Sequence, residues 1–268
     1  TNGRRLWHYF YEPRARPQTS GQASGPASAA VQPPAAAPPR GIAREVRGLA
    51  LGHGHLYFGT QDNFVVALDA TDGKEVWRTN VEDGQIFGCR IDGAALVIKD
   101  LVVVGSTGGD SAHRGHLVAF DGKTGQRRWR FNIIPGPGEK GNETWEGDSW
   151  QYGGGAAWMT GSYDPELDMI YWGTGNASSD FYGEHRKGDN LYTASIVALK
   201  AATGEIAWHF QTVPHDVWDY DSPYECILVD LPVGGRPRKL LIQPNKSGYV
   251  IVLDRTNGEF IAGWKYVD

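Results

Sequence analysis

The chain has 268 residues, 40% of them hydrophobic, which is enough to bury a sizeable core in one large domain or two smaller ones. Its net charge of -5 at pH 7 argues against a nucleic-acid partner, because neutralising phosphates requires a basic face. No apolar run approaches the roughly 20 residues of a membrane helix, so we expect no membrane span in this segment.

The chain begins at Thr1 without a methionine, and we expect it to be part of a longer protein. Residues 1–11 are predicted to end a preceding repeat unit, because Gly3 and Trp7 share the spacing of the repeats described below. Residues 12–40 are rich in Pro, Ala, Ser and Gly and hold few large apolar groups. We predict a loop or disordered insert there, because such a segment cannot offset the entropy cost of ordering.

Residues 41–268 contain a fourfold repeat. Its copies are VVALDATDGKEVW (65–77), LVAFDGKTGQRRW (117–129), IVALKAATGEIAW (196–208) and YVIVLDRTNGEF (249–260). Each reads as an alternating apolar strand, a turn that ends in glycine and a second strand. Such units, separated by variable insertions, predict an all-β propeller of four-stranded blades that is present only in part.

The turn of each repeat has a recurring chemistry. Gly73, Gly125 and Gly204 are each followed four residues later by a tryptophan, namely Trp77, Trp129 and Trp208. Asp69, Asp121 and Asp254 precede their glycines by four residues, where a carboxylate can accept backbone N–H bonds of the turn. Lys200 breaks this acidic pattern in the third repeat.

The two cysteines, Cys89 and Cys226, are too few for a disulfide framework, and no CxxCH motif for covalent haem is present. They either pair in an oxidising compartment or remain two buried free thiols. Both alternatives stay open at the level of sequence.

The repeats together with ETWEGDSW (143–150), YDPELDMIYWGTGN (163–176), RKGDNLYT (186–193) and HDVWDYD (215–221) resemble the quinoprotein methanol/ethanol dehydrogenase family. The resemblance runs from about residue 46 to residue 268. It implies an eight-bladed propeller, about half of it present here, that carries pyrroloquinoline quinone (PQQ) and a calcium or lanthanide ion on its axis. It also implies a periplasmic location.

The segment PHDVWDYDSP (214–223) places three carboxylates in ten residues. If residues 218–221 are extended, Asp219 and Asp221 project to one face, where one carboxylate takes up a proton unless a cation is present. The resemblance makes Asp219 the catalytic base and Asp221 a metal ligand of lanthanide-using members. The alternative is an acidic turn that caps a strand, and we assign His215 and Asp216 to such turn-forming or supporting roles.

Two further metal ligands follow from the resemblance. Asn176, at the end of YWGTGN, matches an amide ligand, and an amide carbonyl suits a hard cation. Asp110, in GSTGGDSAHRG (105–115), falls on the glutamate ligand of the family and is one methylene shorter. Their alternatives are a left-handed turn residue and an exposed acid in a glycine-rich hairpin.

The resemblance also implies four cofactor-binding residues. Arg47 matches an arginine near the cofactor carboxylates, and Thr107 matches a hydroxyl that bonds one of them. Trp158 matches the indole beneath the quinone, and Lys246 matches a cation beside the quinone oxygens. Core packing for the tryptophan and a surface turn for the lysine are the ordinary alternatives.

Three positions depart from the family pattern. A neighbouring cysteine pair that covers the cofactor falls on Gly41 and Ile42, and two cofactor-binding threonines fall on Asp92 and Ala156. We expect Asp92 to repel a tricarboxylate cofactor unless its side chain points away or is protonated.

The sequence therefore predicts a PQQ-dependent oxidoreductase that converts a primary alcohol to an aldehyde by metal-assisted hydride transfer. Its electrons pass to cytochrome c or another acceptor. Two alternatives remain: a non-catalytic propeller that acts as a scaffold or binding module, and a quinoprotein sugar dehydrogenase.

Overall fold

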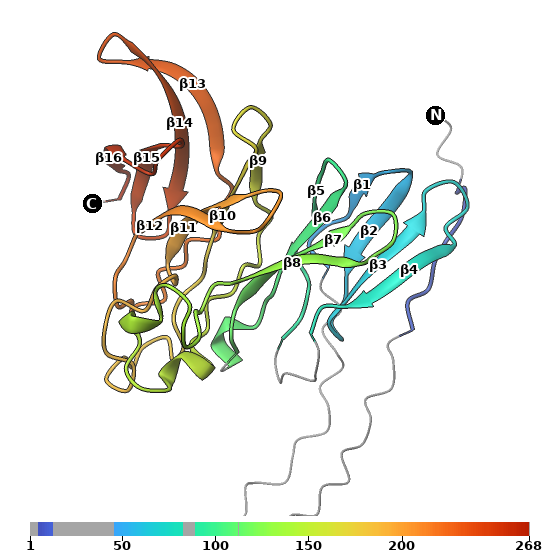
Figure 1. The fold of residues 1–268 in the computed structure, drawn as a ribbon, viewed down its shortest axis with the longest axis horizontal. Helices are drawn as coiled ribbons and strands as arrows, with labels where there is room; N and C mark the ends of the chain where they lie inside the picture. Colours follow the sequence, from blue (N-terminus) through green and yellow to red (C-terminus); the bar gives the residue numbers. More distant parts are fainter. Residues whose placement is uncertain (1–4, 13–45, 83–88, 112, 268) are drawn as a thin grey trace, which may run out of the picture.

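The computed structural model describes residues 5–12, 46–82, 89–111 and 113–267. Sixteen strands form four antiparallel sheets of four strands each, and each sheet is built from strands consecutive in the chain (Figure 1). We call these sheets blades 1 to 4. The predicted all-β architecture of four-stranded blades is confirmed, and the Gly41–Ile42 position, most of the Pro/Ala-rich segment and residues 1–4 lie outside the described residues.

The blades follow the chain in order. Blade 1 contains β1 (Ala50–Gly52), β2 (His55–Gly59), β3 (Phe64–Asp69) and β4 (Glu75–Asn80). Blade 2 contains β5 (Leu96–Ile98), β6 (Leu101–Gly105), β7 (His116–Asp121) and β8 (Arg127–Asn132). Blade 3 contains β9 (Ser162–Asp164), β10 (Met169–Gly173), β11 (Ser195–Lys200) and β12 (Ile206–Gln211). Blade 4 contains β13 (Ile227–Val233), β14 (Arg236–Asn245), β15 (Tyr249–Asp254) and β16 (Phe260–Lys265).

The hydrophobic core lies between neighbouring blades. Side chains from blades 1 and 2, from blades 2 and 3, and from blades 3 and 4 form three separate buried clusters. The third strands of blades 1 to 3 are deeply buried, and β3, β7 and β11 each carry five consecutive buried residues. A strand that is covered on both faces loses the apolar–polar alternation, which explains these continuous apolar runs.

Each predicted tryptophan packs on the turn of the next blade. A Cβ added to Gly125 would lie 2.6 Å from the Trp77 ring, and one added to Gly204 would lie 2.5 Å from the Trp129 ring. Trp208 makes the same contact with Gly258. The indole N–H donates to a backbone carbonyl three residues before each glycine, for example from Trp129 to Ala201 at 2.9 Å. Glycine is therefore required at these turns both for space and for its positive φ.

Trp7, in the N-terminal segment 5–12, makes the same contact with Gly73 and donates to the Ala70 carbonyl. The segment forms no strand and packs on blade 1. At the other end of the series, Ala262 takes the register position that the tryptophans occupy in blades 1 to 3. The indole series therefore stops at blade 4.

The acidic residues of the turns accept backbone N–H groups, as the sequence predicted. Asp121 accepts the backbone N–H groups of Lys123 and Thr124, and Asp254 accepts that of Thr256. Asp69 accepts the N–H of Thr71 at 2.7 Å. These carboxylates fold the turns that Trp7, Trp77 and Trp208 meet, whereas the turn that Trp129 meets has Lys200 at this position.

The two ends of the blades differ. In an antiparallel sheet the start of the first strand and the end of the second lie at one end, and the turn between the third and fourth strands lies at the other. We call these the loop end and the turn end. The short helices η1 (Gly109–Ser111), η2 (Asn142–Thr144) and η3 (Ser149–Tyr152) all lie at the loop end, low in Figure 1.

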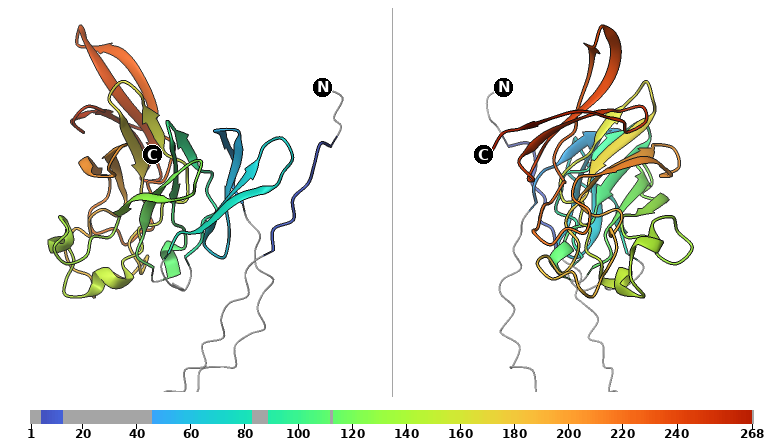
Figure 2. Two further views of the ribbon diagram at one scale, coloured as in Figure 1. Left: turned by 45° about the vertical axis from the view of Figure 1, so that its right-hand side comes forward. Right: turned by 90° about the vertical axis from the view of Figure 1, so that its left-hand side faces the viewer.

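Two further features complete the fold. β13 and β14 form a long hairpin that extends beyond the other sheets (Figure 2). Cys89 and Cys226 are both buried free thiols, which resolves the alternative left open by the sequence. Across the described ranges, none of the helices has the length and apolar character needed to cross a bilayer.

Candidate functional site

A pocket of about 190 Å³ opens at the loop end of the blades. Seven of the eight predicted site residues line it: Arg47, Thr107, Asp110, Trp158, Asn176, Asp219 and Asp221. The eighth, Lys246, places its ammonium group 2.8 Å from an Asp219 oxygen. The structure therefore brings all eight together from segments of the chain that lie far apart in sequence.

The pocket residues occupy two recurrent positions in the blades. Arg47, Trp158 and Asp219 precede the first strand of blades 1, 3 and 4. Asp110 and Asn176 follow the second strand of blades 2 and 3, and so does Lys246 in blade 4. Because both positions lie at the loop end, the topology alone directs these residues toward one place.

The acidic segment is a turn and not a strand, so the extended geometry considered for residues 218–221 is not adopted. Asp219 has a left-handed φ of 61°. The buried carboxylate of Asp216 holds the turn by accepting the N–H groups of Trp218 and Tyr220, at 2.9 and 2.7 Å. His215 contacts the Gly188 carbonyl. Asp219 and Asp221 nevertheless meet, because the turn brings both toward Lys246.

Lys246 supplies a cation between the two carboxylates. Its Nζ lies 2.8 Å from Asp219 Oδ2 and 3.5 Å from Asp221 Oδ2. Burial, together with the nearby charge of Asp219, raises the pKa of Asp221 to about 6, although the backbone N–H of Asn176 and the Lys246 charge act to lower it. This pair of acids is therefore only partly compensated by the lysine, and a metal cation would favour its fully ionised form.

Asn176 presents its carbonyl oxygen toward the η1 loop. Its side-chain N–H groups donate to Asp180 Oδ1 at 2.6 Å and to the Ala177 carbonyl at 3.4 Å. With the nitrogen occupied, Oδ1 is the atom left as a ligand. A Cβ added to Gly109 would lie 3.6 Å from this oxygen, so the glycine leaves open the space between Asn176 and the loop that carries Asp110.

Asp110 lies in η1 and is exposed, at the rim of the pocket. Burial raises the pKa of Asp180, and the charges of Asp110 and Asp219 raise it further. Asp110, Asp180 and Asp219 thus act on one another electrostatically. The donor set around Asn176 consists of hard oxygen atoms, which fits a calcium or lanthanide ion and does not favour a soft metal.

The aromatic wall of the pocket is Trp158. The Arg47 guanidinium lies over its ring, 5.1 Å from the centroid, and Tyr224 meets it edge-on at 6.5 Å. Arg90 also lines the pocket. A flat indole beside two arginines suits a planar anionic molecule, because the ring offers a stacking surface and the arginines offer paired donors.

Thr107 and Asp92 differ from what the resemblance implies. The Thr107 hydroxyl is buried and donates to the Arg90 carbonyl at 3.2 Å, so it must rotate before it can donate to a bound carboxylate. Asp92 lines the pocket, and its carboxylate lies 3.8 Å from Arg47 Nε. Arg47 thereby offsets part of the repulsion expected at Asp92. Ala156 provides only a methyl group to the wall.

Sequence reasoning did not identify Asp180 or Arg90 as site residues. Asp180 orients the Asn176 amide from four residues away, and its only signal in the sequence is an acid that follows a proposed ligand. Arg90 has no recognisable signal in the sequence, because its position beside the pocket depends on backbone pairing with Thr107 in the neighbouring segment.

Known protein families, sequences and structures are similar to this chain. The family model for the β-propeller domain of glucose/ethanol/alcohol dehydrogenases that use PQQ matches residues 89–266. A quinohaemoprotein alcohol dehydrogenase of Comamonas testosteroni is 43% identical over an alignment of 235 residues, and the match covers 82% of this chain and 33% of the relative. A lanthanide-dependent methanol dehydrogenase of Methylacidiphilum fumariolicum is 38% identical over 240 residues, covering 82% of this chain and 39% of the relative.

Among solved structures, the quinohaemoprotein alcohol dehydrogenase ADHIIG of Pseudomonas putida superposes with a TM-score of 0.80 at 39% identity. The match covers 84% of this chain and 35% of that structure. The chain thus spans about a third of the length of the first relatives it matches. On the evidence of the family model and of the blades that place these residues in one pocket, the chain belongs to the β-propeller family of PQQ-dependent alcohol dehydrogenases.

Proposed function

We propose that this chain forms the cofactor- and metal-binding part of an enzyme that oxidises a primary alcohol to an aldehyde. The observation that supports the proposal is the convergence of three oxygen ligands, two acids joined by a lysine, and an indole wall in one pocket. The relatives are named as alcohol or methanol dehydrogenases, which favours an alcohol over a sugar.

The proposed cation is calcium or a lanthanide, held by Asn176 Oδ1 and the carboxylates of Asp110 and Asp221. A second carboxylate beside the amide favours a trivalent ion, because its charge compensates more of the acidic pocket. The name of the Methylacidiphilum relative states dependence on a lanthanide, which agrees with this preference. PQQ, when bound, supplies the electrophilic carbonyl that takes hydride from the alcohol carbon.

Asp219 is the proposed base. Its carboxylate is one-third exposed and lines the pocket, so an alcohol hydroxyl can reach it. Lys246 donates to Oδ2 and leaves Oδ1 to accept the hydroxyl proton. Trp158 would support the flat face of the cofactor, Arg47 and Arg90 would bind its carboxylates, and Thr107 would add a hydrogen bond after rotation.

We propose a cytochrome-type electron acceptor and a periplasmic location. The acceptor is suggested by the names of the quinohaemoprotein relatives, which combine a quinone with haem. The periplasmic location comes from the family resemblance alone.

The test is reconstitution of the full-length protein with PQQ and either calcium or lanthanum. We expect retained quinone absorbance after gel filtration and alcohol-dependent reduction of an artificial electron acceptor dye with at least one of the two ions. Quinone that binds without any alcohol-dependent dye reduction would support the second candidate, a non-catalytic binding module. That alternative is favoured by Asp92 in the pocket wall and by a lysine that already occupies the space between the acids.

A further inference from the structure

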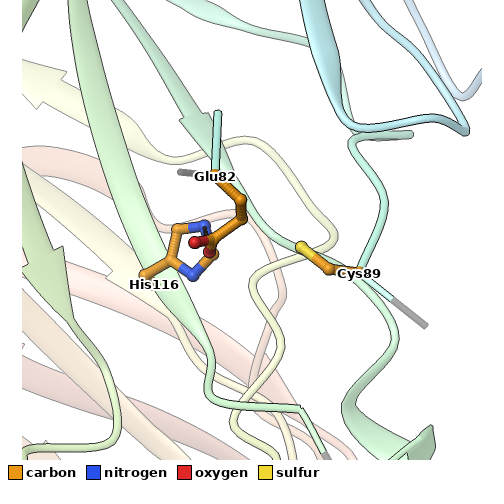
Figure 3. Close-up of side chains that lie close together, drawn as sticks. All are labelled: Glu82, Cys89 and His116. Atoms are coloured by element: carbon orange, nitrogen blue, oxygen red, sulfur yellow. Dashed lines mark ion pairs between the residues drawn. The ribbon is translucent and has the colours of Figure 1, made fainter. Parts of the chain in front are cut away.

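A second cluster of polar side chains lies between blades 1 and 2, outside the pocket. Glu82 follows β4, Cys89 begins the segment that leads to β5, and His116 opens β7. Figure 3 shows the three side chains converging on one point. Glu82 Oε, Cys89 Sγ and a ring nitrogen of His116 all lie within 4.8 Å of one another. All three residues are at least nine-tenths buried.

The orientation of His116 is fixed from its far side. Its Nδ1 lies 3.1 Å from the carbonyl oxygen of Arg114, and only an N–H can donate to a carbonyl. The neutral ring therefore carries its proton on Nδ1 and a lone pair on Nε2. A backbone carbonyl that fixes the tautomer in this way is the usual partner of a metal-binding histidine.

The lone pair of His116 faces a carboxylate. Nε2 lies 2.9 Å from Glu82 Oε1, yet within the described residues neither atom has a hydrogen bond of acceptable geometry. Two acceptor atoms at this distance, both buried, repel each other unless a proton or a metal cation lies beside them. Burial lowers the pKa of His116, which disfavours the extra proton.

The other oxygen of Glu82 is held in place. Arg130 Nη1 lies 2.9 Å from Oε2, so the arginine orients the carboxylate and leaves Oε1 for a ligand. Burial would raise the pKa of Glu82, but the charge of Arg130, which donates to Oε2, lowers it. Glu82 is therefore an ionised acid with one oxygen engaged and one turned toward His116.

Cys89 completes the set. Its Sγ lies 3.5 Å from Asn63 Oδ1, and burial raises the pKa of the thiol to about 12. An unactivated thiol argues against a nucleophilic Cys–His–Glu triad, which requires a thiolate near neutral pH. A metal ion, in contrast, displaces the thiol proton as it binds.

We infer that Glu82, Cys89 and His116 form a second metal site, for a divalent transition ion such as zinc. Thiolate and imidazole ligands select such an ion, whereas the oxygen ligands of the pocket select a hard cation. Three protein ligands leave a fourth tetrahedral position for water. The ion would join the end of blade 1 to blade 2 and order Cys89 next to Arg90, which lines the pocket.

The test uses the full-length protein after treatment with a chelator, with excess calcium present to saturate the pocket. Cobalt(II) serves as a spectroscopic probe for zinc. We expect one equivalent of cobalt with a thiolate-to-cobalt charge-transfer band, and displacement of that cobalt by zinc. Affinity should fall as the pH falls, because binding releases the thiol proton.

Variants separate this site from other cysteine chemistry. Cys89→Ser should abolish the charge-transfer band and lower the affinity for zinc by at least about 100-fold. Arg130→Gln should lower the affinity for zinc by about 10–100-fold. Cys226→Ser removes the only other cysteine in the sequence and should leave binding unchanged. Circular dichroism would show that each variant is folded. The inference is overturned if cobalt binds without a charge-transfer band or if Cys226→Ser, and not Cys89→Ser, removes it.

Discussion

The turn end and the loop end of the blades are built by opposite rules. At the turn end, the same contact recurs: an indole packs on a glycine and donates to a carbonyl in the next blade. At the loop end, the pocket takes different side chains from different blades. The tryptophan–glycine contacts of the turn end join the blades to one another, whereas the loop end gathers acids that repel one another.

This difference separates stability from chemistry in the same fold. Substitutions at the turn end should change the free energy of unfolding, and substitutions at the loop end should change turnover or metal affinity. The following substitutions test the separation in order of expected effect.

The largest effect is expected for Asp219→Asn. An amide cannot accept the alcohol proton, so kcat should fall by about 10²–10⁴-fold under the proposed function. Steady-state dye reduction by the reconstituted full-length protein measures this change, and thermal unfolding should be nearly unaffected because Asp219 is partly exposed. Substantial residual turnover would show that another group takes the proton.

Gly204→Ala should have the next largest effect, on stability. The new methyl group would lie 2.5 Å from the Trp129 ring at a φ of 71°. Overpacking and the left-handed backbone together should lower the free energy of unfolding by about 2–4 kcal/mol. Chemical denaturation measures this change in the free energy of unfolding. Gly234→Ala is the matched control, since its φ is 58° with no described atom within 4 Å. An equal loss in both variants would mean that the indole contact contributes nothing.

Asp164→Asn tests a buried ion pair at the turn end. Asp164 Oδ2 accepts a hydrogen bond from Arg255 Nε at 2.6 Å, and both side chains are buried. Burial raises the pKa of Asp164, but Arg255 and two backbone N–H groups lower it overall. The folded pKa therefore lies below the unfolded value, so the stabilisation is present above about pH 4 and is lost as the pH falls further.

The variant should lose about 1.5–3 kcal/mol at pH 7, and this difference from the wild type should shrink in acid. Asp230→Asn is the control, because Asp230 pairs with the same arginine but is 58% exposed. Its loss should stay below about 1 kcal/mol. The measurement is the free energy of unfolding of both variants and the wild type across pH. A difference between Asp164→Asn and the wild type that is constant with pH would contradict the lowered pKa of Asp164.

Asp180→Ala should have the smallest effect. Without the acid, the Asn176 amide loses the partner that orients it, and metal affinity should fall by about 10-fold. Isothermal titration with calcium and lanthanum measures the change. Glu184→Ala is an exposed acid nearby in the sequence and should leave affinity unchanged.

The sequence predicted the turn end almost completely, because one repeat encodes it: the strand, the acid, the glycine and the tryptophan stand at fixed offsets. It also predicted which residues meet in the pocket, but through the family resemblance and not through periodicity. The sequence left open whether residues 218–221 are extended or form a turn, because the hydrogen bonds by which Asp216 folds the segment leave no trace in the apolar–polar pattern. Asp180 was missed for a similar reason, since its role depends on a single side-chain bond.

The contacts made by the indoles have a consequence at the opposite end of the molecule. Every blade contributes to the pocket, so the distances between the proposed ligands depend on how far one blade is rotated against the next. The tryptophan–glycine contacts at the turn end fix how far each blade is rotated against the next. A small change in packing there would widen or narrow the coordination sphere without touching a single ligand.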